Sequence, residues 1–246
     1  MPVSRTEQAA RNNAIWCDSV YRANGIPGEF HEDIWLNQNP ALRHYPNAVT
    51  LLDQRNSTGQ LGHIRDLVNS SLAGNWCVKD SFCALDLTAL GFQILFEAEW
   101  IWLSATSIRP SRSTFGLDWA RIQTGSELTK WETAWSGDPA DRAATQRSPL
   151  FLPSLLADRD ISFIAAYKDQ EIVAGIVANR AAGVVGLSNF FAPSNDVVSC
   201  WSNCVTTAQA SFQDLPLVGY ERGPQLAIAQ AMGFERLQRL KIWTRR

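Results

Sequence analysis

The stretch LVGYERGPQLAIAQAMGF, residues 217–234, contains a strand, a helix and the start of a second strand. The apolar run over 215–221 predicts a strand, and Pro224 suits the first turn of the helix that follows. Gly233 then ends the helix, because glycine often follows a helix C-terminus. The run FERLQRLKIWT over 234–244 predicts the next strand, so the chain ends in a β-α-β unit.

A similar stretch, ALGFQILFEAEWIW, occupies residues 89–102. In both places the end of a helix is followed by Gly-Phe, a strand and Ile-Trp, and the Gly-to-Trp separations are eleven and ten residues. We therefore predict two related half-structures. The alternative is the coincidence of a common helix stop with a common type of aromatic strand.

Periodicity places further elements on both sides of these stretches. Residues 104–116 are rich in Ser, Thr, Pro and Arg without periodicity, which predicts a linker over 105–116 between parts at 1–104 and 117–246. Three β-rich runs joined by short turns, over 161–193, predict an antiparallel meander. The predicted helices cover 6–24, 61–72, 84–90, 125–137, 150–158, 196–212 and 224–233, and the remaining strands cover 48–52, 76–82, 92–103 and 117–122.

Composition excludes several classes of protein. The formal net charge is −2 and no basic run occurs, which argues against a nucleic-acid partner because phosphate neutralisation needs clustered cations. The N-terminus has no apolar signal core, and the uncharged stretches are too short and polar to span a bilayer, so we expect a cytoplasmic protein. Five cysteines, an odd number, favour reduced thiols, and three dispersed histidines form no metal motif.

The element order from 117 to 246 is β-α-α-β-β-β-α-β-α-β, with Gly-Phe before the last strand. This order resembles the GNAT superfamily of acyl-CoA-dependent N-acyltransferases. A truncated copy without the first strands and the meander covers about 46–104. The resemblance implies an α+β, three-layer fold with a mixed, mostly antiparallel central sheet flanked by helices. It also implies two related halves, as in tandem GNAT proteins with one degenerate half.

The resemblance implies acetyl-CoA or another acyl-CoA as cosubstrate, bound where two parallel strands splay apart, and no metal. The thioester carbonyl would face backbone amides of Leu187, Ser188, Asn189, Phe190 and Phe191. The diphosphate would rest near Ser194, Asn195 and Val197, since helix N-termini attract anions. In the family this loop has the motif Q/R-x-x-G-x-G/A. Residues 194–198 instead contain no Gly, Gln or Arg and include Asp196. The family's Tyr, which protonates the leaving thiolate, corresponds in position to Ala229.

Glu221 and Tyr220 end the strand before the last helix, and we predict them as base and acid. The alternative is an exposed carboxylate and a packed aromatic residue. The N-terminal half offers a second loop at 54–63, which combines Arg55 with two glycines, although a Gly-rich turn also accounts for it. Glu97 and Glu99 share one strand face and could receive an amine or simply meet solvent.

Two hypotheses follow. The first is an N-acyltransferase, most simply an N-acetyltransferase, acting on a small amine or amino-acid-like substrate, as a monomer or homodimer. The second is a GNAT-fold protein that has lost CoA binding and uses the groove for ligand binding or other chemistry. The missing loop glycines favour the second hypothesis, and the element order favours the first.

Overall fold

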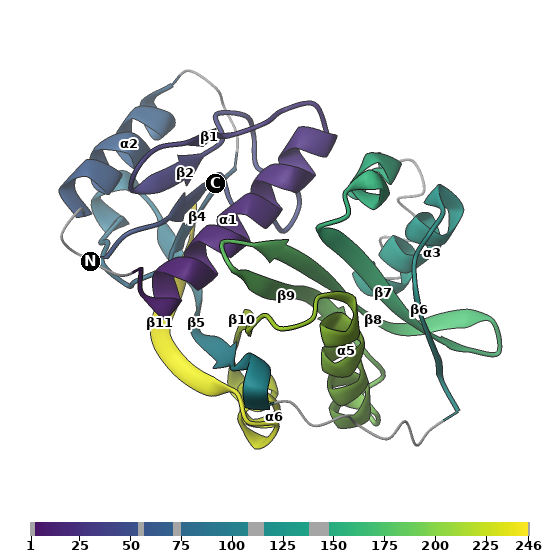
Figure 1. The fold of residues 1–246 in the computed structure, drawn as a ribbon. Coiled ribbons are helices and arrows are strands. Elements are labelled where there is room, and N and C mark those ends of the chain that lie inside the picture. Colours follow the sequence, from purple (N-terminus) through teal and green to yellow (C-terminus); the bar gives the residue numbers. More distant parts are fainter. Residues whose placement is uncertain (1–2, 54–56, 71–74, 108–115, 138–147, 246) are drawn as a thin grey trace. The chain divides into compact units, whose positions relative to one another are not determined.

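The computed structural model describes residues 3–53, 57–70, 75–107, 116–137 and 148–245. The chain forms two compact units, which we describe separately (Figure 1). Unit 1 comprises residues 1–102 and 219–246, and unit 2 comprises residues 103–218. The C-terminal segment 219–246 thus makes its contacts with the N-terminal part of the chain. Most of the predicted linker, residues 108–115, lies outside the described residues.

Unit 1 is built on strands in the order β1-β2-β3-β4-β11-β5, antiparallel except for the parallel pair β3 and β4. The C-terminal strand β11 therefore lies between two strands of the N-terminal segment. The strands are β1 (Glu29–Phe30), β2 (Ile34–Leu36), β3 (Ala48–Thr50), β4 (Trp76–Asp80), β5 (Gln93–Leu103) and β11 (Glu235–Arg245). The helices are α1 (Arg5–Ala23), α2 (Ser57–Asn69), the 3₁₀ turn η2 (Thr88–Leu90) and α6 (Gly223–Ala231).

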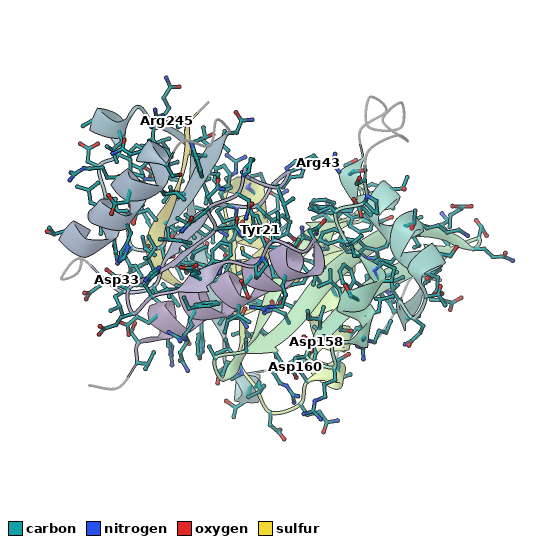
Figure 2. All side chains as sticks on the ribbon, turned by 90° about the horizontal axis from the view of Figure 1, so that it is seen from above. Tyr21, Asp33, Arg43, Asp158, Asp160 and Arg245 are labelled. Atoms are coloured by element: carbon teal, nitrogen blue, oxygen red, sulfur yellow. The ribbon has the colours of Figure 1, made fainter. Side chains whose placement is uncertain are left out.

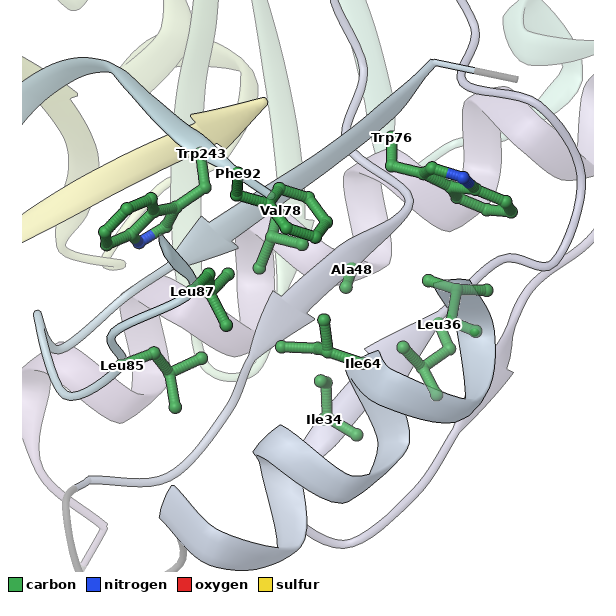
Figure 3. Close-up of a cluster of buried hydrophobic side chains, with 11 residues drawn as sticks. Ile34, Leu36, Ala48, Ile64, Trp76, Val78, Leu85, Leu87, Phe92 and Trp243 are labelled. Atoms are coloured by element: carbon green, nitrogen blue, oxygen red, sulfur yellow. The ribbon is translucent and has the colours of Figure 1, made fainter. Parts of the chain in front are cut away.

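Helices cover both faces of the unit 1 sheet. A capping box between Ser4 and Glu7 starts α1, which contacts β3 and β11. Ile64 of α2 belongs to a cluster with Ala48 and Val78, shown in Figure 3, on the other face. Every residue of β3 is buried as a result, which is the pattern of a strand covered on both sides. Unit 1 has the predicted three-layer arrangement.

The two Gly-Phe turns of unit 1 have the same geometry. Gly91 and Gly233 have φ of 79° and 94°, the left-handed region that glycine adopts without strain. The N–H of Phe92 donates to the carbonyl of Leu87 at 3.2 Å, and that of Phe234 to the carbonyl of Ala229 at 3.1 Å. Each bond spans five residues, as in a Schellman motif. The prediction that both glycines end helical turns is confirmed, although the first is a single 3₁₀ turn rather than a helix over 84–90.

One expectation for the N-terminal half is wrong. The truncated copy was expected to lack the first strands and the meander, whereas β1 and β2 form a short antiparallel meander with β3. These strands have two and three residues, too few to show the alternation that identifies a strand in sequence.

Unit 2 is built on strands in the order β10-β9-β8-β7-β6, antiparallel except for β10 with β9. The predicted meander is confirmed, and its two turns are left-handed pairs, Asp169-Gln170 and Ala182-Gly183. The strands are β6 (Asp118–Arg121), β7 (Ile161–Lys168), β8 (Glu171–Ala181), β9 (Val184–Phe191) and β10 (Leu217–Glu221), whose last three residues belong to unit 1. The helices are α3 (Gly125–Ser136), α5 (Val197–Ser211) and the 3₁₀ helices η3 (Ala105–Ser107) and η4 (Pro153–Ala157).

The unit 2 sheet also packs between helices. Trp131 of α3 contacts the rings of Phe163 and Phe191 on one face. Cys200 of α5 packs with Ala166 and Ala174 on the other face. Asp158 and Asp160 lie in the turn before β7 (Figure 2), where the Asp160 carboxylate pairs with Arg180 of β8. The fold is thus α+β with mostly antiparallel strands flanked by helices, as the sequence predicted.

Candidate functional site

The C-terminal end of β9 carries the first group of predicted residues. β9 pairs with β10 at Val185 and Gly186, and then continues five residues further to Phe191. On its other edge, Ser188 pairs with Val177 and Phe191 with Gly175, so β9 holds one extra residue there. This is a β-bulge, and Asn189 within it has φ of 54°. Asparagine tolerates this left-handed conformation better than most residues with a side chain.

The side chains of this segment point into both layers of unit 2. Phe190 packs on Trp201 of α5 with ring centroids 5.6 Å apart, and Phe191 packs on Trp131 of α3 at 5.2 Å. Leu187 is buried, and the Ser188 hydroxyl oxygen is buried without a hydrogen-bond partner among the described residues. The aromatic anchors hold the backbone of the bulge in place, so that its amides have fixed directions.

The N-terminus of α5 carries the second group. The N–H of Cys200 donates to the carbonyl of Asp196 at 2.9 Å, the first bond of the helix. The amides of Val197, Val198 and Ser199 have no backbone acceptor among the described residues. Ser194, Asn195 and Asp196 are exposed, and Asp196 is the N-cap without a side-chain capping bond. The free amides and the helix dipole suit an anion, whereas the Asp196 carboxylate opposes one.

Tyr220 is held by a set of unit 1 residues that the sequence did not single out. Its ring meets Trp100 of β5 edge-on, with centroids 5.6 Å apart. The ammonium of Lys79 lies 4.3 Å from the centroid of the Tyr220 ring and donates to Asn13 Oδ1 at 2.6 Å. These contacts join α1, β4 and β5, which are remote in sequence, and no local pattern reveals them.

Glu221 follows Tyr220 in β10, and successive side chains of a strand point to opposite faces. The two predicted catalytic residues therefore do not share a face. Burial raises the pKa of the half-buried Glu221 carboxyl from 4.5 to about 7. A carboxylate with a pKa near neutrality is suited to accept and release a proton at neutral pH.

Hydrogen bonds connect the segments at the end of the parallel pair β3 and β4 in unit 1. Where the parallel pair β3 and β4 ends, the N–H of Ser81 donates to Thr50 Oγ1 at 2.8 Å. The fully buried Gln60 of α2 donates through Nε2 to the carbonyls of Leu52 at 2.8 Å and Asp33 at 3.2 Å. Arg55, the cation predicted for this loop, lies outside the described residues.

Glu97 and Glu99, predicted to share one face of a strand, lie beside arginines of β11. Glu99 forms a bidentate pair with Arg236 across β5 and β11, and Glu97 lies 3.9 Å from Arg239. The five cysteines are free thiols. Within the described residues, no group of three or more His, Cys, Asp or Glu side chains could hold a metal ion, and no helix is long and apolar enough to cross a membrane.

Solved structures share this architecture at low sequence identity. A GCN5-related N-acetyltransferase from Kribbella flavida matches with a TM-score of 0.62 and 11% identity, over 96% of this chain and 95% of that chain. A protein of unknown function from Staphylococcus epidermidis matches with a TM-score of 0.58 and 11% identity, over 86% and 83% of the two chains. A tandem GNAT protein from the clavulanic acid biosynthesis pathway matches at 0.53 and 13% identity, over 76% and 68%.

Comparison with protein-family models and with curated protein sequences finds no match. At the identities of the structural matches, the likeness concerns the fold. This chain has the fold of the GCN5-related N-acetyltransferases.

Proposed function

We propose that this protein is an acyl-CoA-dependent N-acyltransferase, most simply an N-acetyltransferase, that acts on a small amine or amino-acid-like acceptor. The observation that carries the proposal is the geometry of β9 in this fold. The strand extends beyond its pairing with β10 at a bulge and leads through residues 192–196 to a helix N-terminus. The first three amides of this helix have no backbone acceptor among the described residues. The proposal includes a tandem arrangement of two GNAT-like halves in a cytoplasmic protein.

In this proposal, backbone amides of residues 187–191 polarise the thioester carbonyl, and the amides that begin α5 receive the diphosphate. Glu221 takes the proton of the attacking amine, for which a pKa of about 7 is suited. Tyr220 protonates the leaving thiolate from the opposite face of β10, in place of the family's Tyr, whose position is Ala229. The bonds of Gln60 in the N-terminal half support a single acyl-CoA site per chain.

Thermal denaturation with and without acetyl-CoA tests the proposal. At a hundredfold excess over Kd, a ligand that binds only the folded state stabilises it by about 2.7 kcal/mol. For a chain of this size, about 2 to 4 °C of Tm accompany each kcal/mol, so a rise of about 5 to 10 °C is expected.

The charge at the helix N-terminus provides a sharper test. Asp196→Asn removes the repelling carboxylate and keeps a good N-cap residue, so it should enlarge the acetyl-CoA shift. Asp169→Asn is the matched control, because Asp169 is an exposed carboxylate in the β7–β8 turn and should leave the shift unchanged. If millimolar acetyl-CoA and CoA shift neither the wild type nor the Asp196 variant, the acyltransferase proposal is wrong.

The second candidate is a protein with this fold that no longer binds CoA. The exposed Asp196 in a loop without Gly, Gln or Arg favours it. It predicts no acetyl-CoA shift in any of these variants.

A further inference from the structure

Lys79 is a buried lysine of β4. Its relative exposure is 3%, on a strand that lies within the unit 1 sheet. Among the described residues, no Asp or Glu carboxylate forms an ion pair with it. The carboxylate of the next residue, Asp80, instead accepts backbone N–H groups of Ala84 and Leu85, each at 3.0 Å.

A buried charge of this kind is costly. The free-energy cost of removing an ammonium from water is offset only by close partners. Among the described residues, Lys79 has the amide oxygen Asn13 Oδ1 at 2.6 Å and the ring of Tyr220 as such partners. An apolar side chain of similar length, such as methionine, would fill the same space without this cost. Packing alone therefore does not explain why a charged side chain occupies this position.

The group that Lys79 faces is the ring of Tyr220. The ammonium lies 4.3 Å from the ring centroid, and Trp100 packs edge-on at 5.6 Å. The ring is thus held from two sides by residues of β4 and β5. A cation over a ring is attracted by its electron density, and this attraction grows when the ring carries negative charge.

We propose that Lys79 is a positioning residue for Tyr220: it orients the phenol and stabilises the negative charge that the ring acquires when Tyr220 gives up its proton. The inference rests on the proposed acyl transfer. The amine nitrogen forms a bond to the carbonyl carbon. As the C–S bond breaks, its electron pair stays on sulfur and takes the phenolic proton, which leaves CoA as a thiol. The phenolate faces the Lys79 ammonium and regains a proton from water, while Glu221 releases the proton of the amine to solvent.

A double-mutant cycle tests this coupling. Wild type, Lys79→Met, Tyr220→Phe and the double variant are assayed by release of the CoA thiol from acetyl-CoA, with a panel of aliphatic amines and amino acids as acceptors. With Tyr220 present, Lys79→Met should lower kcat about 10-fold and leave KM for acetyl-CoA unchanged, because the contact acts only after binding. When Lys79→Met is added to the Tyr220→Phe variant, it should have no further effect.

Stability measurements separate this role from a structural one. Lys79→Met should melt at the wild-type temperature or above it, because it removes a buried charge. If Lys79→Met does not fold, Asn13→Ala takes its place in the cycle, since Asn13 holds the ammonium. Lys79→Arg, which keeps the charge, should restore part of the rate.

The outcomes distinguish the two proposals. If the wild type is active but the effects of Lys79→Met and Tyr220→Phe on kcat are independent, the proposed role of Lys79 is wrong. The acyltransferase proposal then still holds. A wild type that neither binds acetyl-CoA nor releases CoA thiol with any acceptor overturns both.

Discussion

Replacing Glu221 with glutamine isolates the cost of ionising one half-buried carboxyl group. Burial raises the pKa of Glu221 from 4.5 to about 7. Between pH 4.5 and pH 7, the folded state therefore still holds a proton that the unfolded state has lost. In this window the free energy of unfolding falls as the pH rises, by up to about 1.4 kcal/mol per pH unit. Below pH 4.5 both states are protonated and the cost is absent.

The total cost above pH 7 is about 3 kcal/mol at most, because solvent around the half-buried group screens part of it. Glu221→Gln keeps the shape and carries no charge, so its stability should lack this decline. The variant should match the wild type near pH 4.5 and be more stable than it at pH 8. The difference between the two proteins cancels the titration of all groups that they share.

Urea denaturation at several pH values between 4.5 and 8, followed by tryptophan fluorescence, measures this difference. A matched control is Glu171→Gln, because Glu171 is an exposed carboxylate at the start of β8. Parallel stability curves for wild type and Glu221→Gln would refute the raised pKa. The proposed base role predicts in addition that kcat/KM rises through pH 7 in the wild type and is low at every pH in the variant.

Three predictions concern the fold. Gly91→Val and Gly233→Val should each lower the free energy of unfolding by about 1 kcal/mol or more, since a β-branched residue does not readily adopt positive φ. An unchanged urea midpoint would contradict this. Asn189→Val should lower Tm and weaken any shift of Tm by acetyl-CoA, whereas Asn189→Gly should keep the wild-type Tm. Equal Tm values for the two variants would show that stability does not depend on the left-handed conformation at residue 189. Deleting residues 235–246 removes the strand between β4 and β5, so near-UV circular dichroism of the unit 1 tryptophans should be lost, while deleting residues 1–3 should preserve it.

Much of the fold could be predicted from the sequence, because it is encoded by neighbouring residues. The runs over 161–168 and 171–181 coincide with β7 and β8, since apolar strands joined by two-residue turns specify their own pairing. Gly91 and Gly233 were identified from their places after helical segments, and both are left-handed. The short strands β1 and β2 were missed because two or three residues carry no periodicity.

Only the tertiary structure decided where distant segments meet. The sequence places β11 last in the chain, but its position between β4 and β5 depends on pairing with residues more than a hundred positions away. Tyr220 was predicted as an acid from its place at a strand end, whereas Lys79, Asn13 and Trp100 joined it through three separate elements. The raised pKa of Glu221 likewise comes from burial. Local periodicity reports the conformation of a segment, while contacts and desolvation depend on which segments pack together, and no short stretch of sequence contains that information.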